Sequence, residues 1–290
     1  MKKVNGYKVF TGFNTVFMLG IILITAYPIW YVVAASFSDP GALYKHEGLL
    51  FLPLKPFSTQ AYEMVFKNRQ ILSGFANTLF VLVVGVLVNL LFTTLGALFM
   101  SVKGPMLSGA FATMVIITMY FNGGLVPTYL NIVDLGLIDS LWSLIIPCAI
   151  GTTNMIIMKS AFESIPSSLT ESALLDGANY WQVLTKILIP LSKATIAVLV
   201  LYYGVGHWNS WFSASIYLRT PDKYPLQLVM QNIMSALTEG AVSGDADAAA
   251  ATAQLMKYAL IVVVSMPIMC VYPFIQKYFV KGVMIGAVKG

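Results

Sequence analysis

Charged residues are scarce in this 290-residue chain: only 10% are Asp, Glu, Lys or Arg, whereas 58% are hydrophobic, and the mean hydropathy is +0.79. A soluble globular domain is about 25% charged and about 45–50% apolar. So few charges cannot cover a water-facing surface, which argues against a soluble enzyme, a nucleic-acid-binding module and a disordered chain. The sequence therefore predicts a protein of the lipid bilayer, in which a net charge of +5 reflects basic cytoplasmic loops rather than nucleic acid.

The residues that build metal, redox and catalytic sites are also few. Cys148 and Cys270 both lie in apolar runs, and His46 and His207 are too far apart in the sequence for a zinc site. The chain has no phosphate-binding G-x-x-x-x-G-K-[ST] loop, no H-E-x-x-H and no G-x-S-x-G. We therefore expect no ATP site, metal or cofactor on this chain, and no enzymatic activity of its own.

Six apolar stretches are long enough to cross a bilayer, which takes about 20 residues. They are residues 9–37, 75–102, 106–126, 137–158, 187–212 and 258–275. Lysines gather at the amino end, in the turn at 103–105, in the loop after 158 and in the tail, whereas residues 122–136 contain no Lys or Arg. This distribution predicts a multi-pass protein of the cell membrane with both termini in the cytoplasm and external loops at about 38–74, 122–136 and 213–257.

The middles of the predicted spans carry no carboxylate or histidine, groups that proton-driven carriers need at membrane depth. A secondary carrier is therefore a weaker alternative, and a stand-alone membrane enzyme is weaker still. Gly204 and Gly206 lie in a predicted span, where we expect them to pack against another helix.

The cytoplasmic loop at about 163–190 is too long for a simple connection. Ser167 or Ser168 can cap a first helix, with Glu171 in its first turn. Asp176-Gly177 is a turn signal, and Asn179 can cap a second helix that runs to Pro190. The pattern predicts two helices joined by a glycine turn, which form either a rigid foot for a partner or a plain interfacial connector.

This loop resembles the EAA loop through which permease subunits of ABC importers contact their ATPases. The residues that carry the resemblance are Glu171, Ser172, Ala173, Asp176, Gly177, Ala178, Ile187 and Pro190. The glycine follows the glutamate by six residues and the proline follows the glycine by thirteen, as in that family. Ser172 stands where a second alanine is usual, and Ala194 where a second proline often follows.

Further segments extend the resemblance over nearly the whole chain. They are Phe-Ala-Asn-Thr at 75–78, Phe-Asn-Gly-Gly-Leu-Val-Pro-Thr-Tyr at 121–129, Trp-Asn-Ser-Trp at 208–211 and Gly-Ala-Val-Lys-Gly at 286–290. Together they are similar to MalG-like permease subunits of carbohydrate ABC importers, especially the alginate and LplC types. The resemblance implies an all-α integral membrane protein with six transmembrane helices in the type I (MetI-like) fold. It implies a first helix and external segment over 1–74 and a permease core over 75–290.

The resemblance also implies partners. These are a second permease in a heterodimer, two ATPase subunits that hold ATP and Mg, an extracytoplasmic solute-binding protein, and an oligosaccharide or polysaccharide as substrate. It implies that the tail, with Lys289 and Gly290, contacts the ATPases, although a basic membrane anchor explains the same residues. A permease for a different solute, such as a peptide or a polyamine, remains the main alternative.

Aromatic and amide side chains late in the fifth predicted span suit a sugar pathway, because sugars stack on aromatic rings and hydrogen-bond to amides. The candidates are Tyr202, Tyr203, Trp208, Asn209 and Trp211, for which an interfacial aromatic belt is the alternative. Outside the spans, residues 56–69 predict an amphipathic helix with Phe57, Tyr62, Val65 and Phe66 on its apolar face. Residues 213–257 predict a mobile solvent loop that, by the resemblance, reaches the binding protein.

Overall fold

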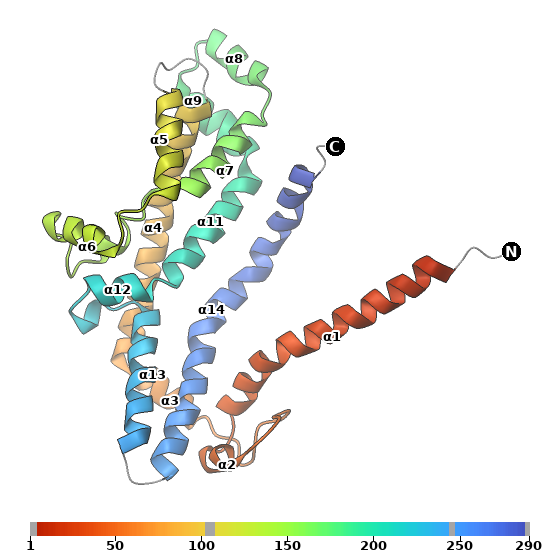
Figure 1. Cartoon of the computed structure of the whole chain (residues 1–290), viewed down its shortest axis with the longest axis vertical. Coiled ribbons are helices and arrows are strands. Elements are labelled where there is room, and N and C mark those ends of the chain that lie inside the picture. Colours follow the sequence, from red (N-terminus) through yellow and green to blue (C-terminus); the bar gives the residue numbers. More distant parts are fainter. Residues whose placement is uncertain (1–4, 102–107, 244–246, 288–290) are drawn as a thin grey trace. The chain divides into compact units, whose positions relative to one another are not determined.

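A computed structural model describes residues 5–101, 108–243 and 247–287, and every regular element within those ranges is helical (Figure 1). The chain divides into two compact units. One comprises residues 1–69 and 230–266, and the other residues 70–229 and 267–290. The all-helical architecture agrees with the fold class predicted from the sequence.

The first unit contains α1 (Asn5–Ser36), α2 (Pro40–Lys45), α3 (Gln60–Lys67) and parts of α13 (Leu226–Ser243) and α14 (Asp247–Ala287). The amphipathic helix expected at 56–69 is α3, which buries Ala61 and Val65. Tyr62 of α3 stacks on Phe37 with ring centroids 4.9 Å apart, and its hydroxyl lies 2.7 Å from that of Ser36. These contacts dock α3 on the carboxyl end of α1, whereas Phe57 and Phe66 stay exposed.

The second unit is built around α4 (Arg69–Ser101), whose buried face consists largely of small and polar residues. Small residues allow helix backbones to approach closely in a bilayer. The other elements of this unit are α5 (Ser108–Tyr120), α6 (Leu125–Asp134), the 3-10 helix Leu141–Leu144, α7 (Thr152–Glu163), α8 (Ser167–Leu175), α9 (Tyr180–Val183), the π-helix Leu184–Leu188, α10 (Ile189–Leu191), α11 (Lys193–Trp208), α12 (Trp211–Tyr217) and the 3-10 helix Pro221–Lys223.

Three helical stretches are long and apolar enough to cross a bilayer alone: Gly6–Ser36, Arg69–Ser101 and Ala250–Val271. Two bent pairs bring the number to five if each counts as one span. In one pair α5 meets α6 at 117°, and in the other Tyr180–Leu191 meets α11 at 86°. The third and fifth predicted spans are therefore broken helices.

The fourth predicted span, 137–158, is not one helix. It consists of turns, a 3-10 helix, an irregular stretch over 145–151 and the start of α7. With 12 residues at about 1.5 Å each, α7 covers about 18 Å of a hydrocarbon core about 30 Å thick. Side chains of α4 and α11 hydrogen-bond the irregular backbone, as described below, and so replace the bonds that a helix would supply.

Residues 213–257 also differ from the prediction of a mobile loop. Within the described residues they form the end of α12, a 3-10 helix, α13 and the start of α14. The apolar residues Leu226, Leu228 and Val229 are buried, which explains why this stretch is helical rather than a solvent loop. The residues 244–246 lie outside the described part of the chain.

Candidate functional site

The predicted cytoplasmic foot is formed by α8 and α9 at one end of the second unit (Figure 1). Two details of the prediction are wrong. The residue that caps α8 is Pro166 rather than Ser167 or Ser168, because the extended backbone of a proline leads directly into the helix. Glu171 consequently lies beyond the first turn of α8, where it is exposed to solvent.

The turn after α8 has the geometry that the sequence predicts. Gly177 adopts a φ of +85°, in the region that favours glycine. Its amide donates to the carbonyl of Leu174 at 3.1 Å, and the amide of Ala178 donates to that of Ala173 at 2.9 Å. This pair of bonds is a Schellman motif, which ends a helix sharply and satisfies its last carbonyls.

The second helix of the foot starts with a full capping box. The Asn179 side chain accepts from the amide of Gln182, and the Gln182 side chain accepts from the amide of Asn179, both at 2.9 Å. The predicted cap is thus confirmed. Behind it, Leu184 and Leu188 of the π-helix are buried, while Ile187 and Pro190 are half-buried.

The foot is fixed to the unit on one side and open on the other. Ala173 and Ala178 pack against a core that includes Phe162, Val183 and Leu184. On the open side, Glu171, Ser172 and Asp176 are exposed, and Leu175 is 89% exposed. The open side of the foot therefore presents both charged and apolar groups to solvent.

The five residues proposed for a sugar pathway fall into two groups. Tyr202, Asn209 and Trp211 are exposed, and the amide of Asn209 donates to the carbonyl of Val205 at 3.0 Å. Tyr203 and Trp208 are buried within the second unit. Trp208 meets Phe75 edge to face, with ring centroids 6.1 Å apart.

The hydroxyl of Tyr203 connects three elements of the unit. It lies 2.6 Å from the hydroxyl of Thr93 on α4 and accepts the amide hydrogen of Gly151 at 3.2 Å. Gly151 is needed there, because a Cβ at that position would lie 2.9 Å from the tyrosine oxygen. Tyr203 therefore holds the start of α7 against α4 and α11.

A second polar connection joins the same elements and was not predicted. The Asn89 side chain donates to the carbonyl of Cys148, so its oxygen faces Nε2 of His207 at 2.7 Å, and that nitrogen must be the donor. His207 is buried in the protein and lies near the end of the fifth predicted span rather than in its middle. Sequence inspection missed the pair because Asn89 and His207 are 118 residues apart.

Among the described residues, the expectation that Gly204 and Gly206 pack against a helix is not met, since a Cβ at either position would meet no atom within 4 Å. The close approaches occur instead at glycines of α4. A Cβ on Gly85 would lie 2.5 Å from His207, and one on Gly96 would lie 2.5 Å from Met155.

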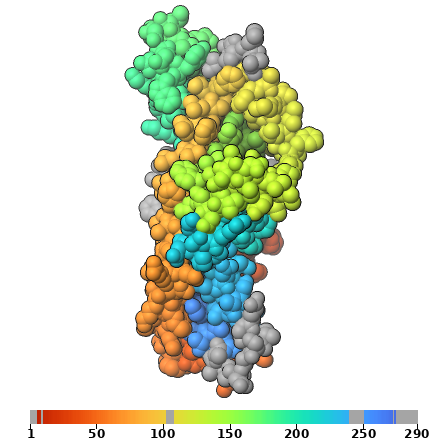
Figure 2. All heavy atoms as spheres, turned by 90° about the vertical axis from the view of Figure 1, so that its left-hand side faces the viewer, coloured from red at the N-terminus to blue at the C-terminus, as the bar shows by residue number. Residues whose placement is uncertain are grey.

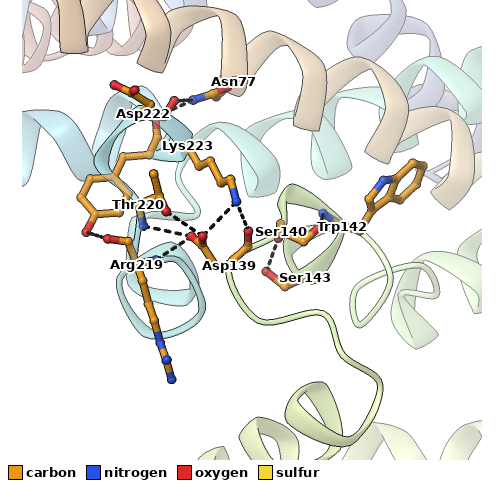
Figure 3. Close-up of polar contacts among 10 residues, drawn as sticks. Asn77, Asp139, Ser140, Trp142, Ser143, Arg219, Thr220, Asp222 and Lys223 are labelled. Carbon is orange, nitrogen blue, oxygen red and sulfur yellow. Dashed lines mark hydrogen bonds and ion pairs between the residues drawn. The ribbon is translucent and has the colours of Figure 1, made fainter.

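A third polar cluster centres on Asp139, between α6 and the first 3-10 helix (Figure 3). Its carboxylate accepts from the amides of Arg219 and Thr220, from the Thr220 hydroxyl and from Lys223 Nζ, at 2.7–2.9 Å. These donors, first among them Lys223, hold the pKa of Asp139 well below its usual range. Asn77 of α4 donates to the carbonyls of Asp222 and Tyr224, which anchors the same loop to α4.

The family of the chain follows from comparison with known proteins. Residues 69–285 match the model of the binding-protein-dependent transport system inner membrane component. The chain belongs to this family. It is therefore a multi-pass membrane permease and the non-catalytic subunit of an ABC importer that works with an ATPase and a binding protein. The predictions that it is no enzyme and carries no cofactor agree with this membership.

Individual relatives cover almost the whole chain. Protein LplC of Bacillus subtilis is 40% identical over 286 residues, covering 98% of this chain and 96% of its own length. The polygalacturonan/rhamnogalacturonan transport system permease protein YtcP of B. subtilis is 38% identical, covering 94% and 96%. A crystal structure of a bacterial ABC transporter that imports the acidic polysaccharide alginate contains a chain that superposes with a TM-score of 0.83 at 31% identity, covering 96% of this chain and 99% of that one.

Proposed function

We propose that this chain is the transmembrane subunit of an importer for oligosaccharides or polysaccharides. The proposal rests on its end-to-end similarity to permeases named for polygalacturonan and rhamnogalacturonan and to a chain of the alginate importer. A permease named for arabinooligosaccharides, 22% identical over 93% of this chain, supports the same class of solute. A peptide or polyamine permease is the competing assignment.

In the proposed mechanism the α8–α9 foot couples transport to ATP hydrolysis. Its coupling residues are Glu171, Ser172, Ala173, Asp176, Gly177, Ala178, Ile187 and Pro190. The exposed members of this set contact the ATPase, and the Glu171 carboxylate meets a basic group there. Leu175, which is exposed on the same helix but is not part of the motif, adds apolar area. Ala173 and Ala178, which pack against the core, transmit the force to the bundle together with the half-buried Ile187 and Pro190.

The remaining parts of the proposal concern topology and assembly. Both termini lie in the cytoplasm, and a second, different permease completes the pore. Residues 1–74 supply the first helix and an external segment, whereas 75–290 supply the core. The tail contacts the ATPases; Lys289 and Gly290 lie outside the described residues. Of the pathway candidates, Tyr202, Asn209 and Trp211 are exposed and can contact a substrate, whereas Tyr203 and Trp208 support the bundle from inside.

Reconstitution of the importer tests the assignment. This chain is expressed with its companion permease, ATPase and binding protein, and vesicles are offered labelled oligogalacturonides, alginate oligosaccharides, arabino-oligosaccharides, a peptide mixture and spermidine. We expect ATP-dependent uptake from at least one saccharide pool and none from the last two. Uptake of only peptide or spermidine would replace the proposed solute class.

The coupling role is tested by Glu171→Lys, with Asp134→Lys as the matched charge reversal on α6. Both carboxylates are exposed, and neither lies in one of the three helices that are long enough to span alone. We expect Glu171→Lys to release the ATPase during purification, because a reversed charge repels a basic partner. Asp134→Lys should retain the ATPase. If both variants retain the ATPase equally well, the foot is only a connector between helices.

A further inference from the structure

An open cavity of about 700 Å³ lies between α5 and the start of α7 in the second unit. Thr118 and Asn122 line one side of it, and Thr152, Thr153 and Asn154 line the other. Figure 2 shows α5 and α6, in yellow and yellow-green, on the face of the molecule turned toward the viewer. None of the described residues that line the cavity is ionisable.

The surroundings of this cavity suit water or a polar ligand. The irregular backbone of residues 145–151 borders it at Pro147, Ile150 and Gly151. Non-helical backbone at membrane depth is tolerated only where protein buries it or where it lines a water-filled space. A lipid tail satisfies none of the polar side chains and free amides gathered here, so water or a polar ligand suits the cavity better than lipid does.

The polar groups that face the cavity have unused hydrogen-bonding capacity. Within the described residues, no hydrogen bond engages the side chains of Thr153 and Asn154. The amides of Thr152, Thr153 and Asn154 occupy the first turn of α7, where a helix supplies no acceptors. Hydroxyl, amide and N–H groups therefore converge on the cavity from one element.

The bundle holds this element rigidly from behind. Tyr203 accepts from the amide of Gly151 at 3.2 Å, and Asn89 donates to the carbonyl of Cys148. Met155 is buried against Gly96 of α4. The break before α7 is thus a fixed feature, and it leaves the amides of the first turn of α7 without helical acceptors.

We propose that this cavity is a saccharide-binding subsite on the transport pathway, in which Thr153 and Asn154 hydrogen-bond sugar hydroxyls. This inference rests on the proposed function and adds α5 and α7 to the elements that contact the substrate. Neutral donors and acceptors match sugar hydroxyls, and Phe111 and Pro147 in the same lining supply apolar surface for sugar C–H faces. The volume accommodates one or two sugar rings, since ligand pockets commonly span about 300–1,000 Å³.

Thiol protection in the reconstituted importer tests the subsite directly. In a background of Cys148→Ala and Cys270→Ala, Thr153→Cys is modified by a small methanethiosulfonate reagent with and without the oligosaccharide pool that the wild type transports. We expect the saccharide-loaded binding protein with ATP to slow modification several-fold. Thr113→Cys, on α5 but outside the lining, should react at the same rate in both conditions.

Uptake kinetics supply a second measurement. Thr153→Val and Asn154→Leu remove hydrogen-bonding groups at nearly constant volume, so each should raise the KM for uptake by about 2- to 10-fold, the loss expected for one neutral hydrogen bond. Thr113→Val should leave KM unchanged. If the wild type imports a saccharide but protection and KM are unaffected, the subsite is wrong and the proposed function stands. If the wild type imports no saccharide, both fall.

Discussion

Gly85 of α4 lies directly against the imidazole of His207 on α11: a Cβ on Gly85 would be 2.5 Å from Nε2 and 2.8 Å from Cε1. That Nε2 is the atom that donates to Asn89, whose amide in turn holds the carbonyl of Cys148. Because glycine has no Cβ, position 85 leaves room for the His207 ring. The hydrogen bonds of His207, Asn89 and Cys148 can then join α4, α11 and the irregular stretch before α7.

Gly85→Ala should therefore destabilise the protein by displacing the His207 ring from Asn89. Overpacking of this kind costs about 1–3 kcal/mol. The measurement is the melting temperature of the detergent-purified importer, which should fall by several degrees. Gly109→Ala is the control, because a Cβ at position 109 would meet nothing within 4 Å. Equal melting temperatures for the two variants would contradict the packing described here.

The parts of the fold that the sequence predicts correctly are those that depend on residues close to one another in the sequence. The turn at Gly177 and the cap at Asn179 depend on contacts within five residues, and both were found as expected. The stretch 137–151 was predicted as a helix because its apolar run has the right length. It is irregular because Asp139 bonds Thr220 and Cys148 bonds Asn89, partners 81 and 59 residues away.

The candidate functional sites likewise divide into one that the sequence predicts and one that it does not. The foot is recognisable because its residues form one continuous motif. The cavity is not, because Thr118 and Asn154 come from separate helices and its shape depends on the break before α7. From the sequence we predict Tyr203 and Trp208 as pathway residues, although the structure buries them. The sequence alone does not show which face of the helix is buried, because aromatic side chains occur on both.

The Asp139 cluster should stabilise the loop that carries Thr220 and Lys223. Asp139→Asn removes the charge opposite Lys223 Nζ, which lies 2.9 Å from the carboxylate. Asparagine still tolerates the φ of 57° at this position. We expect a lower melting temperature for Asp139→Asn and no change for Asp134→Asn, whose side chain is exposed at the end of α6.

The pH dependence of that difference follows from the lowered pKa of Asp139. A carboxyl group whose pKa is lowered by folding stabilises the fold above its unfolded pKa, about 3.9, and this contribution disappears as the pH falls through the folded value. The gap in melting temperature between wild type and Asp139→Asn should thus stay constant from pH 8 to about pH 5. A gap that shrinks within that window would show that another group controls the cluster.

Both α8 of the foot and α6 end in a Schellman motif, which allows a matched test of coupling. Gly136 has a φ of +67°, and its amide and that of Leu137 bond Val133 and Ile132 in the pattern seen after α8. A Cβ at Gly136 or Gly177 would meet nothing within 4 Å. Asparagine, which tolerates positive φ, should cost each site about 1 kcal/mol or less.

Gly177→Asn should nevertheless reduce stimulation of the ATPase by the loaded binding protein, because a side chain at the tip of the foot meets the docked partner. Gly136→Asn should leave that stimulation intact, since its strain is equal but its motif lies at the end of α6. The measurement is ATP hydrolysis by reconstituted importer with matched protein levels. If both variants lose ATPase stimulation to the same extent, backbone strain is the cause. The proposed contact at Gly177 would then be wrong.

The orientation of the chain is the last prediction, and the coupling role depends on it. The foot must lie in the cytoplasm to meet an ATPase, and the Lys and Arg distribution places α6 outside. In a background without Cys148 and Cys270, Asp134→Cys on α6 should react with an impermeant maleimide added to intact spheroplasts. Ser168→Cys on α8 should react only after permeabilisation, and both positions are exposed, so access depends on the side of the membrane alone. The reverse pattern would place the foot outside the cell, where no ATP is available to couple, and would overturn its proposed role while leaving the family membership intact.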